Sequence, residues 1–196
     1  MFALQLSDDS LQKFERRKAI IDGLFELSNN IKKALALEPQ IKKLVGEKYK
    51  DIRDMIILGR GYQSATCLEA ALKIKEVTYV HAEGILAGEL KHGPLALIEP
   101  AIPIILVMTK DRHYSDSDNA LKQVTARGGQ PLVICSEDDV SGNFAGLETL
   151  KVPTVIEPLQ AIINIIPCQL LSYHMAVQRG INPDNPRNLA KSVTTA

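Results

Sequence analysis

The spacing of apolar residues divides the chain into two parts. Between Asp9 and about Tyr49 they recur at intervals of three to five, which is typical of amphipathic helices, with Ser10 placed as an N-cap. Polar residues at 28–30 and the pair Glu38-Pro39 predict two breaks, and therefore three short helices. We expect residues 1–50 to form a helical lead-in and residues 51–196 to form one domain.

After residue 50, short runs of β-branched and apolar residues alternate with helical patterns. Continuous apolar runs between glycine-rich turns predict buried parallel strands. The predicted strands are 55–58, 77–81, 104–107, 131–134 and 149–152, and the predicted helices are 63–75, 86–98, 119–126 and 159–179. This alternation predicts an α/β fold, a three-layer αβα sandwich with a mainly parallel sheet.

The last predicted helix leads into a polar tail. We expect Pro167 to kink or restart this helix and Gly180 to end it as a C-cap. Pro183 and Pro186 prevent helix from resuming, so the tail must cross the surface. In an open α/β sheet, the expected place for a functional tail is the crevice at the carboxyl ends of the strands.

Composition narrows the classes of function. The chain has 196 residues, 45% of them hydrophobic, and 23 basic residues balance 23 acidic ones, so neither nucleic acid nor a membrane surface is expected as the main partner. The apolar runs at 101–109 and 158–171 are too short to cross a bilayer. The start of the chain does not have the pattern of a signal peptide, and three widely spaced cysteines predict reduced thiols in the cytoplasm.

Three charged residues form the first candidate site. Glu69, Lys73 and Glu76 are spaced four and three apart, so they share one face of a helix. A solvated stripe of ion pairs explains this spacing. Alternatively, the face looks into the crevice, where Glu76 moves a proton between neighbouring carbons and Lys73 holds or protonates an oxygen.

Histidine and glycine residues supply weaker candidates. His92 lies beside Gly93-Pro94, and an imidazole suits opening and closing of a sugar ring, although a structural histidine fits equally. No two histidines have metal-ligand spacing, so no metal or other cofactor is expected. The turn at 59–64 presents backbone N–H groups that could receive an anion, or is simply a tight turn.

Lys191 also has two readings. A lysine near a chain end is usually solvated. Alternatively, its amine lies in a site where Arg187 or Lys73 suppresses its charge, so that it can form a Schiff base with a ketose carbonyl.

Several segments together resemble one family. In order along the chain they are GRGY at 59–62, LEAALKIKE at 68–76, HAEGILAGELKHGPLAL at 81–97, VTAR at 124–127 and PRNLAKSVT at 186–194. The chain resembles the carboxyl-terminal, second sugar isomerase (SIS) domain of the glutamine–fructose-6-phosphate aminotransferases, or glucosamine-6-phosphate synthases, and is most similar to the eukaryotic forms. The resemblance implies a flavodoxin-like SIS fold and a cytoplasmic homodimer that binds fructose 6-phosphate and glucosamine 6-phosphate.

The resemblance also implies roles for individual residues. Glu76 would move the proton between C1 and C2, with Lys73 assisting at an oxygen. His92 would open and close the sugar ring and would reach the site from the neighbouring subunit. Lys191 would engage the C2 carbonyl, and Ala190 would line the site through its backbone.

Two departures limit what this chain is expected to do alone. Ala70 stands where the family usually has glycine. The family's Ser/Thr-rich loops for the sugar phosphate and its glutaminase domain have no counterpart in these 196 residues, so glutamine hydrolysis is not expected of this polypeptide. The main hypothesis is the isomerase part of an enzyme that feeds UDP-N-acetylglucosamine synthesis. The alternatives are a non-catalytic sugar-phosphate-binding or dimerisation module and a structural remnant that pairs with a full-length partner.

Overall fold

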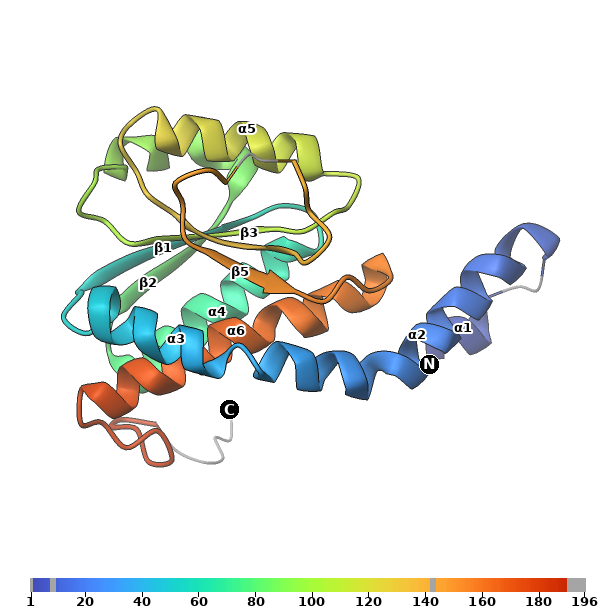
Figure 1. Cartoon of the computed structure of the whole chain (residues 1–196), viewed down its shortest axis with the longest axis horizontal. Helices are drawn as coiled ribbons and strands as arrows, with labels where there is room; N and C mark the ends of the chain where they lie inside the picture. The colour runs from blue at the N-terminus through green and yellow to red at the C-terminus, as the bar shows by residue number, and fades with distance from the viewer. Residues whose placement is uncertain (1, 8–9, 142–143, 190–196) are drawn as a thin grey trace, which may run out of the picture.

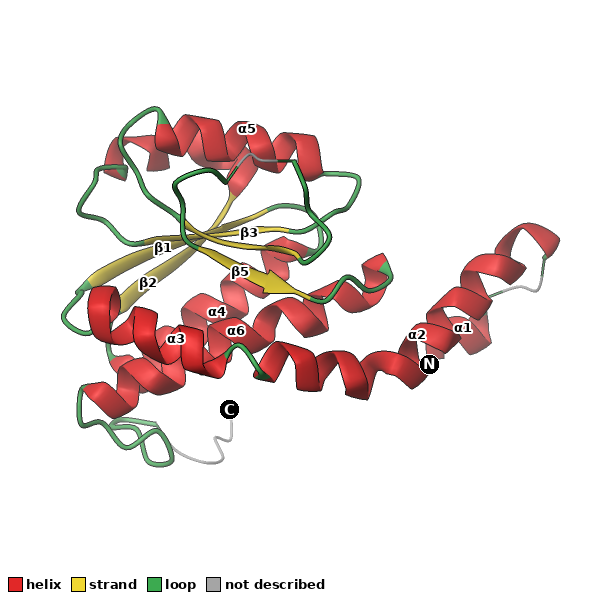
Figure 2. Cartoon of the chain, in the orientation of Figure 1, coloured by secondary structure: helices red, strands yellow, loops and turns green. Residues whose placement is uncertain are grey.

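Five parallel strands form a single sheet in the order β2-β1-β3-β4-β5. The structure is a computed structural model and describes residues 2–7, 10–141 and 144–189. Helices cover both faces of the sheet (Figures 1 and 2), so the predicted three-layer α/β fold is confirmed. The strands are β1 (Asp54–Gly59), β2 (His81–Leu86), β3 (Ile104–Met108), β4 (Leu132–Ser136) and β5 (Thr149–Val152).

Two hydrophobic cores lie on the two faces. Alternate side chains of a strand point to opposite faces, so Ile57 belongs to one core while Ile56 and Leu58 belong to the other. The first core is covered by α3 (Glu38–Leu44), the π-helix η1 (Val45–Tyr49), α4 (Gln63–Thr78) and α6 (Glu157–Gln178). The second is covered by the 3-10 helices η2 (Ala87–His92) and η3 (Pro94–Leu97) and by α5 (Tyr114–Thr125).

The lead-in helices are α1 (Phe2–Leu6) and α2 (Leu11–Leu35), and the first half of α2 extends away from the sheet (Figure 1). The predicted break at 28–30 is wrong because α2 is continuous. Asn29 remains on the exposed side of the helix and donates a hydrogen bond to Glu26 over 3.1 Å, so its polar side chain does not compete with the backbone.

The segment from 77 to 98 also differs from the prediction. The strand predicted at 77–81 is instead the end of α4, and β2 begins only at His81. The hydroxyl of Thr78 donates to the carbonyl of Ile74 over 2.6 Å, which retains this β-branched residue in the helix. The helix predicted at 86–98 is divided into η2 and η3 by Gly93, whose φ of 140° is open to glycine.

The carboxyl-terminal helix α6 is unbroken through Pro167, so the expected restart does not occur. The predicted cap at Gly180 is confirmed. Its φ is 70°, its N–H donates to the carbonyl of Val177, and the N–H of Ile181 donates to the carbonyl of Ala176.

A buried polar network joins α6 to the carboxyl ends of three strands. Asn164 is fully buried, and its Nδ2 donates to Oε1 of Gln63 over 2.9 Å and to Oγ1 of Thr109 over 3.0 Å. Its Oδ1 accepts from Nε2 of Gln160 over 2.9 Å, and that nitrogen also donates to the carbonyl of Pro153. Since Gln63, Thr109 and Pro153 follow β1, β3 and β5, the side chains of Asn164 and Gln160 together connect all three strand ends.

We predict that Asn164→Ala lowers the free energy of unfolding by about 2–4 kcal/mol, because it removes three buried hydrogen bonds and leaves their partners unpaired. Urea denaturation followed by circular dichroism measures the change. Gln169→Ala is the matched control, since Gln169 is an exposed amide residue on the same helix. Equal midpoints for the two variants would show that the network contributes little to stability.

Candidate active site

Two carboxylate side chains lie beside Lys73 on α4. Its Nζ lies 2.6 Å from Oε2 of Glu76 and 3.6 Å from Oε1 of Glu69. The side chains of Lys73 and Glu76 are 32% and 29% exposed, so this pair is half-buried. The spacing therefore places the three groups on one helix face, as predicted. We call Glu69, Lys73 and Glu76 the α4 cluster.

The electrostatics of the α4 cluster assign different roles to its members. The hydrogen bond from Lys73 to Glu76 raises the pKa of the ammonium above its ordinary value. Partial burial lowers this pKa, but the negative charges of both carboxylates raise it further. Lys73 therefore stays charged at neutral pH and acts as a hydrogen-bond donor. Of this closest pair, Glu76 is the group that can accept a proton.

The α4 cluster lies toward the amino ends of the strands. The helix runs back along the sheet after β1, and Tyr79 ends it immediately before β2 begins. Tyr79 has a φ of 60°, a left-handed conformation that costs a residue with a side chain about 1–2 kcal/mol. Such a backbone at a helix end persists where surrounding contacts hold it.

Those contacts come from the start of the tail. The backbone N–H of Arg187 donates to the hydroxyl of Tyr79 over 2.7 Å. The guanidinium of Arg187 also lies 4.2 Å from the centre of the Tyr79 ring, which is a cation–π contact. The described end of the tail is thus attached three residues after Glu76. No pattern in the sequence indicates a function for Tyr79, which lies inside the strand predicted at 77–81.

The expected position of the tail is wrong for its described part. It was predicted at the carboxyl ends of the strands, but Arg187 meets Tyr79 at the amino ends. The reason is the direction of α6, which ends near the amino ends of the strands. Arg179, directly after α6, donates hydrogen bonds to the carbonyls of Thr78 and Ile52. Ala190 and Lys191, the predicted substrate-binding residues, lie outside the described residues.

His92 is not brought to the α4 cluster. It lies at the end of η2, and the neighbouring Leu90 is fully buried in the core on the α5 face. Ala70 and Ile74 of α4 are fully buried in the core on the other face. The sheet therefore separates His92 from Lys73 and Glu76 within one chain. Ala70, the departure from the family pattern, lies in this core.

The turn after β1 is tight. A Cβ at Gly59 would come within 2.5 Å of Sγ of Cys67, and Gly61 has a φ of 57°. These constraints explain the two glycines without a ligand. Arg60 between them pairs with Asp116, with 3.3 Å between Nε and Oδ2.

The cysteines are structural. Cys67, Cys135 and Cys168 are free and buried, and burial raises the pKa of Cys135 to about 11 and of Cys168 to about 12. In the described ranges, no group of three or more His, Cys, Asp or Glu side chains could hold a metal ion. None of the helices in these ranges is long and apolar enough to cross a membrane.

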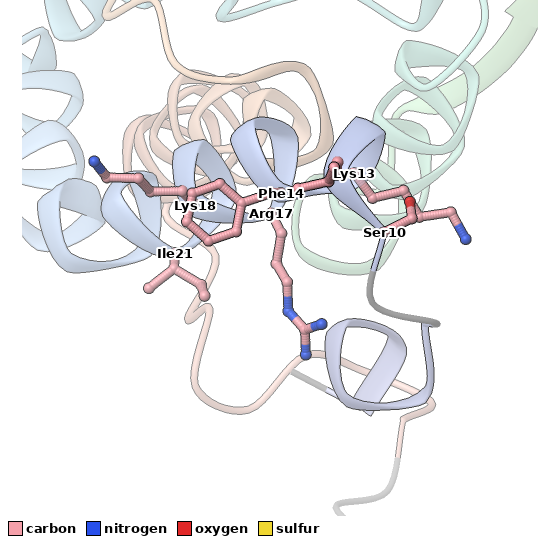
Figure 3. A pocket seen from close by; sticks show the side chains of 7 residues that line it. Ser10, Lys13, Phe14, Arg17, Lys18 and Ile21 are labelled. Carbon is pink, nitrogen blue, oxygen red and sulfur yellow. The ribbon is translucent and has the colours of Figure 1, made fainter.

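A separate hollow lies along the outer part of α2 (Figure 3). It is far in sequence from the α4 cluster, and the side chains that line it are apolar or basic apart from the hydroxyl of Ser10, so the hollow offers no acid–base pair. It is lined by Ser10, Leu11, Lys13, Phe14, Arg17, Lys18 and Ile21.

Comparison with known proteins identifies the fold and its relatives. The family described as SIS domain matches residues 48–179. The chain is 52% identical over 194 residues to glutamine–fructose-6-phosphate aminotransferase (isomerizing) of Encephalitozoon cuniculi, and 52% identical over 198 residues to that of Saccharomyces cerevisiae. Each alignment covers 99% of this chain, but the chain spans only 28% of the length of either relative.

A solved structure gives the same result. The C-terminal domain of glucosamine-fructose-6-phosphate aminotransferase from Francisella tularensis superimposes with a TM-score of 0.74 at 36% identity, covering 80% of this chain and 45% of that one. The family match spans more than half of the chain. The chain therefore belongs to the SIS domain family and corresponds to the carboxyl-terminal region of the glutamine–fructose-6-phosphate aminotransferases.

Proposed function

We propose that this chain is the isomerase part of an enzyme that converts fructose 6-phosphate and glutamine-derived ammonia to glucosamine 6-phosphate. The observation that carries the proposal is the Lys73–Glu76 pair, with 2.6 Å between ammonium and carboxylate. It lies in a chain that is 52% identical to a glutamine–fructose-6-phosphate aminotransferase (isomerizing). The product, glucosamine 6-phosphate, would feed the synthesis of UDP-N-acetylglucosamine. The proposed location of the enzyme is the cytoplasm.

The chemistry follows from the two groups. An aldose–ketose isomerisation moves one proton between neighbouring carbons, so the carboxylate of Glu76 takes the proton from C1 and returns it to C2. The charge that develops on the substrate oxygen is met by the ammonium of Lys73, which remains protonated because its pKa is raised. Lys191 engages the C2 carbonyl through its amine, and the backbone of Ala190 lines the site.

The position of His92 supports a shared site. Ring opening needs a group that can donate and accept a proton, and His92 lies on the opposite face of the sheet from Glu76 in its own chain. We therefore propose that His92 serves the site of a neighbouring subunit in a homodimer.

The proposal is tested in a chimera in which this chain replaces the corresponding part of the S. cerevisiae relative. We expect the chimera to form glucosamine 6-phosphate from fructose 6-phosphate and glutamine. Glu76→Gln should lower kcat by about 100-fold or more, because the amide cannot accept the proton. Glu69→Gln, the matched control on the same helix face, should stay within about twofold because its ion pair is exposed.

Two results would contradict this function. Equal kcat values for Glu76→Gln and Glu69→Gln would remove Glu76 from the proton transfer. A folded chimera that binds fructose 6-phosphate but makes no product would favour the non-catalytic binding module.

We also predict that Tyr79 positions the tail that carries Lys191. Tyr79→Leu removes both the hydrogen bond to Arg187 and the cation–π contact, and should lower kcat of the chimera about 10-fold. Tyr79→Phe retains the ring and should have a smaller effect. Thermal melting should change little for Tyr79→Phe, which separates positioning from folding.

Tyr173→Leu is the control for Tyr79→Leu, because Tyr173 is 48% exposed and lies on α6 away from the tail contact. A kcat for Tyr79→Leu equal to that of Tyr173→Leu would refute the positioning role.

A further inference from the structure

A second cavity lies on the α5 face of the sheet, opposite the α4 cluster. It has a volume of about 650 Å³ and lies between η2 and α5, beside the turn that follows β1. The lining residues are Arg60, Ala87, Gly88, Lys91, Asp116, Asn119, Lys122, Gln123, Ala126 and Arg127. Arg60 and Ala87 directly follow β1 and β2, so the cavity opens at the carboxyl ends of these strands, where ligands bind in open α/β sheets.

The charge of the lining is strongly one-sided. Arg60, Lys91, Lys122 and Arg127 are basic, and Asp116 is the one carboxylate in the lining. Arg60 pairs with Asp116, and Lys122 pairs outside the lining with Asp118 over 2.6 Å. Within the described residues, no carboxylate lies at ion-pair distance from Lys91 or Arg127. The chain as a whole has no net charge, so this excess is local.

The basic groups are held in place by their surroundings. A Cβ at Gly88 would come within 2.9 Å of the Arg60 guanidinium, so glycine makes room for that side chain. The guanidinium of Arg127 is anchored at one nitrogen, which donates to the carbonyl of Gln123 over 2.9 Å, and its other donors remain for a ligand.

The lining also contains amide side chains, one of which is Gln123. Oε1 of Gln123 is buried and has no hydrogen-bond partner within the described part of the chain. Asn119 adds a second amide to the lining.

We propose that this cavity binds a phosphorylated polar small molecule, with the phosphoryl group held by Lys91 and Arg127 beside Arg60. Guanidinium and ammonium groups form charge-assisted hydrogen bonds to phosphate oxygens. The volume exceeds that of an inorganic phosphate ion and is in the range of small-molecule pockets, and the two amides suit hydroxyl groups. The site does not rest on the proposed isomerase function, because it lies on the other face of the sheet.

The test is an NMR titration of the isotope-labelled chain with fructose 6-phosphate, inorganic phosphate and unphosphorylated fructose. We expect saturable shifts of amide resonances in η2 and α5 with fructose 6-phosphate and none with fructose. The double variant Lys91→Gln, Arg127→Gln should raise the Kd from these resonances about 10-fold or more. The double variant Lys42→Gln, Arg53→Gln is the control, since it removes the same two charges from exposed positions elsewhere.

The outcomes are distinct. Equal affinity for inorganic phosphate and fructose 6-phosphate would show that the cavity recognises the phosphoryl group alone and that free phosphate is its ligand. Tighter binding of fructose 6-phosphate supports a phosphorylated small molecule as the ligand. Absence of saturable shifts in η2 and α5, or equal Kd values for the two double variants, overturns the proposal. Glu76→Gln should leave these shifts unchanged, so that failure of the isomerase function is seen separately.

Discussion

The hydrogen bonds of one buried amide, Asn164, set the frame on which both candidate sites depend. Its bond to Gln63 fixes the first residue of α4, and its bond to Thr109 fixes the loop after β3. A helix is rigid along its length, so the position of Gln63 determines where Lys73 and Glu76 lie three to four turns later. A buried network of this kind is favourable only when every member is paired, which limits the arrangements that the helices can adopt.

The strand order explains why His92 cannot join Glu76 within one chain. From β1 the chain moves to β2 on one side, and from β2 it returns past β1 to β3 on the other. Right-handed crossovers in opposite directions place their connections on opposite faces of a sheet. Thus α4 lies on one face and η2 on the other, and only a second chain could bring an imidazole from η2 to the carboxylate of α4.

The sequence predicted the parts of the fold that local physics decides. Ile104–Met108 and Leu132–Ser136 are fully buried central strands, so their runs are continuously apolar and easily recognised. The edge strand β2 was missed because it contains His81, Glu83 and Gly84, whereas the β-branched Val77 and Thr78 favoured a strand. The spacing of Glu69, Lys73 and Glu76 correctly predicted that they share one helix face. No local pattern could predict the contact between Arg187 and Tyr79, because these residues are 108 positions apart.

The two faces of the chain have complementary electrostatics. The α4 cluster has two carboxylates around one ammonium, so it suits proton transfer but repels a phosphate dianion. The cavity beside η2 has an excess of cations and suits a phosphate. It does not suit proton transfer, because Asp116, the one carboxylate among its lining residues, is already paired with Arg60. Within one chain, the sheet therefore separates the carboxylate of Glu76 from the cations of this cavity.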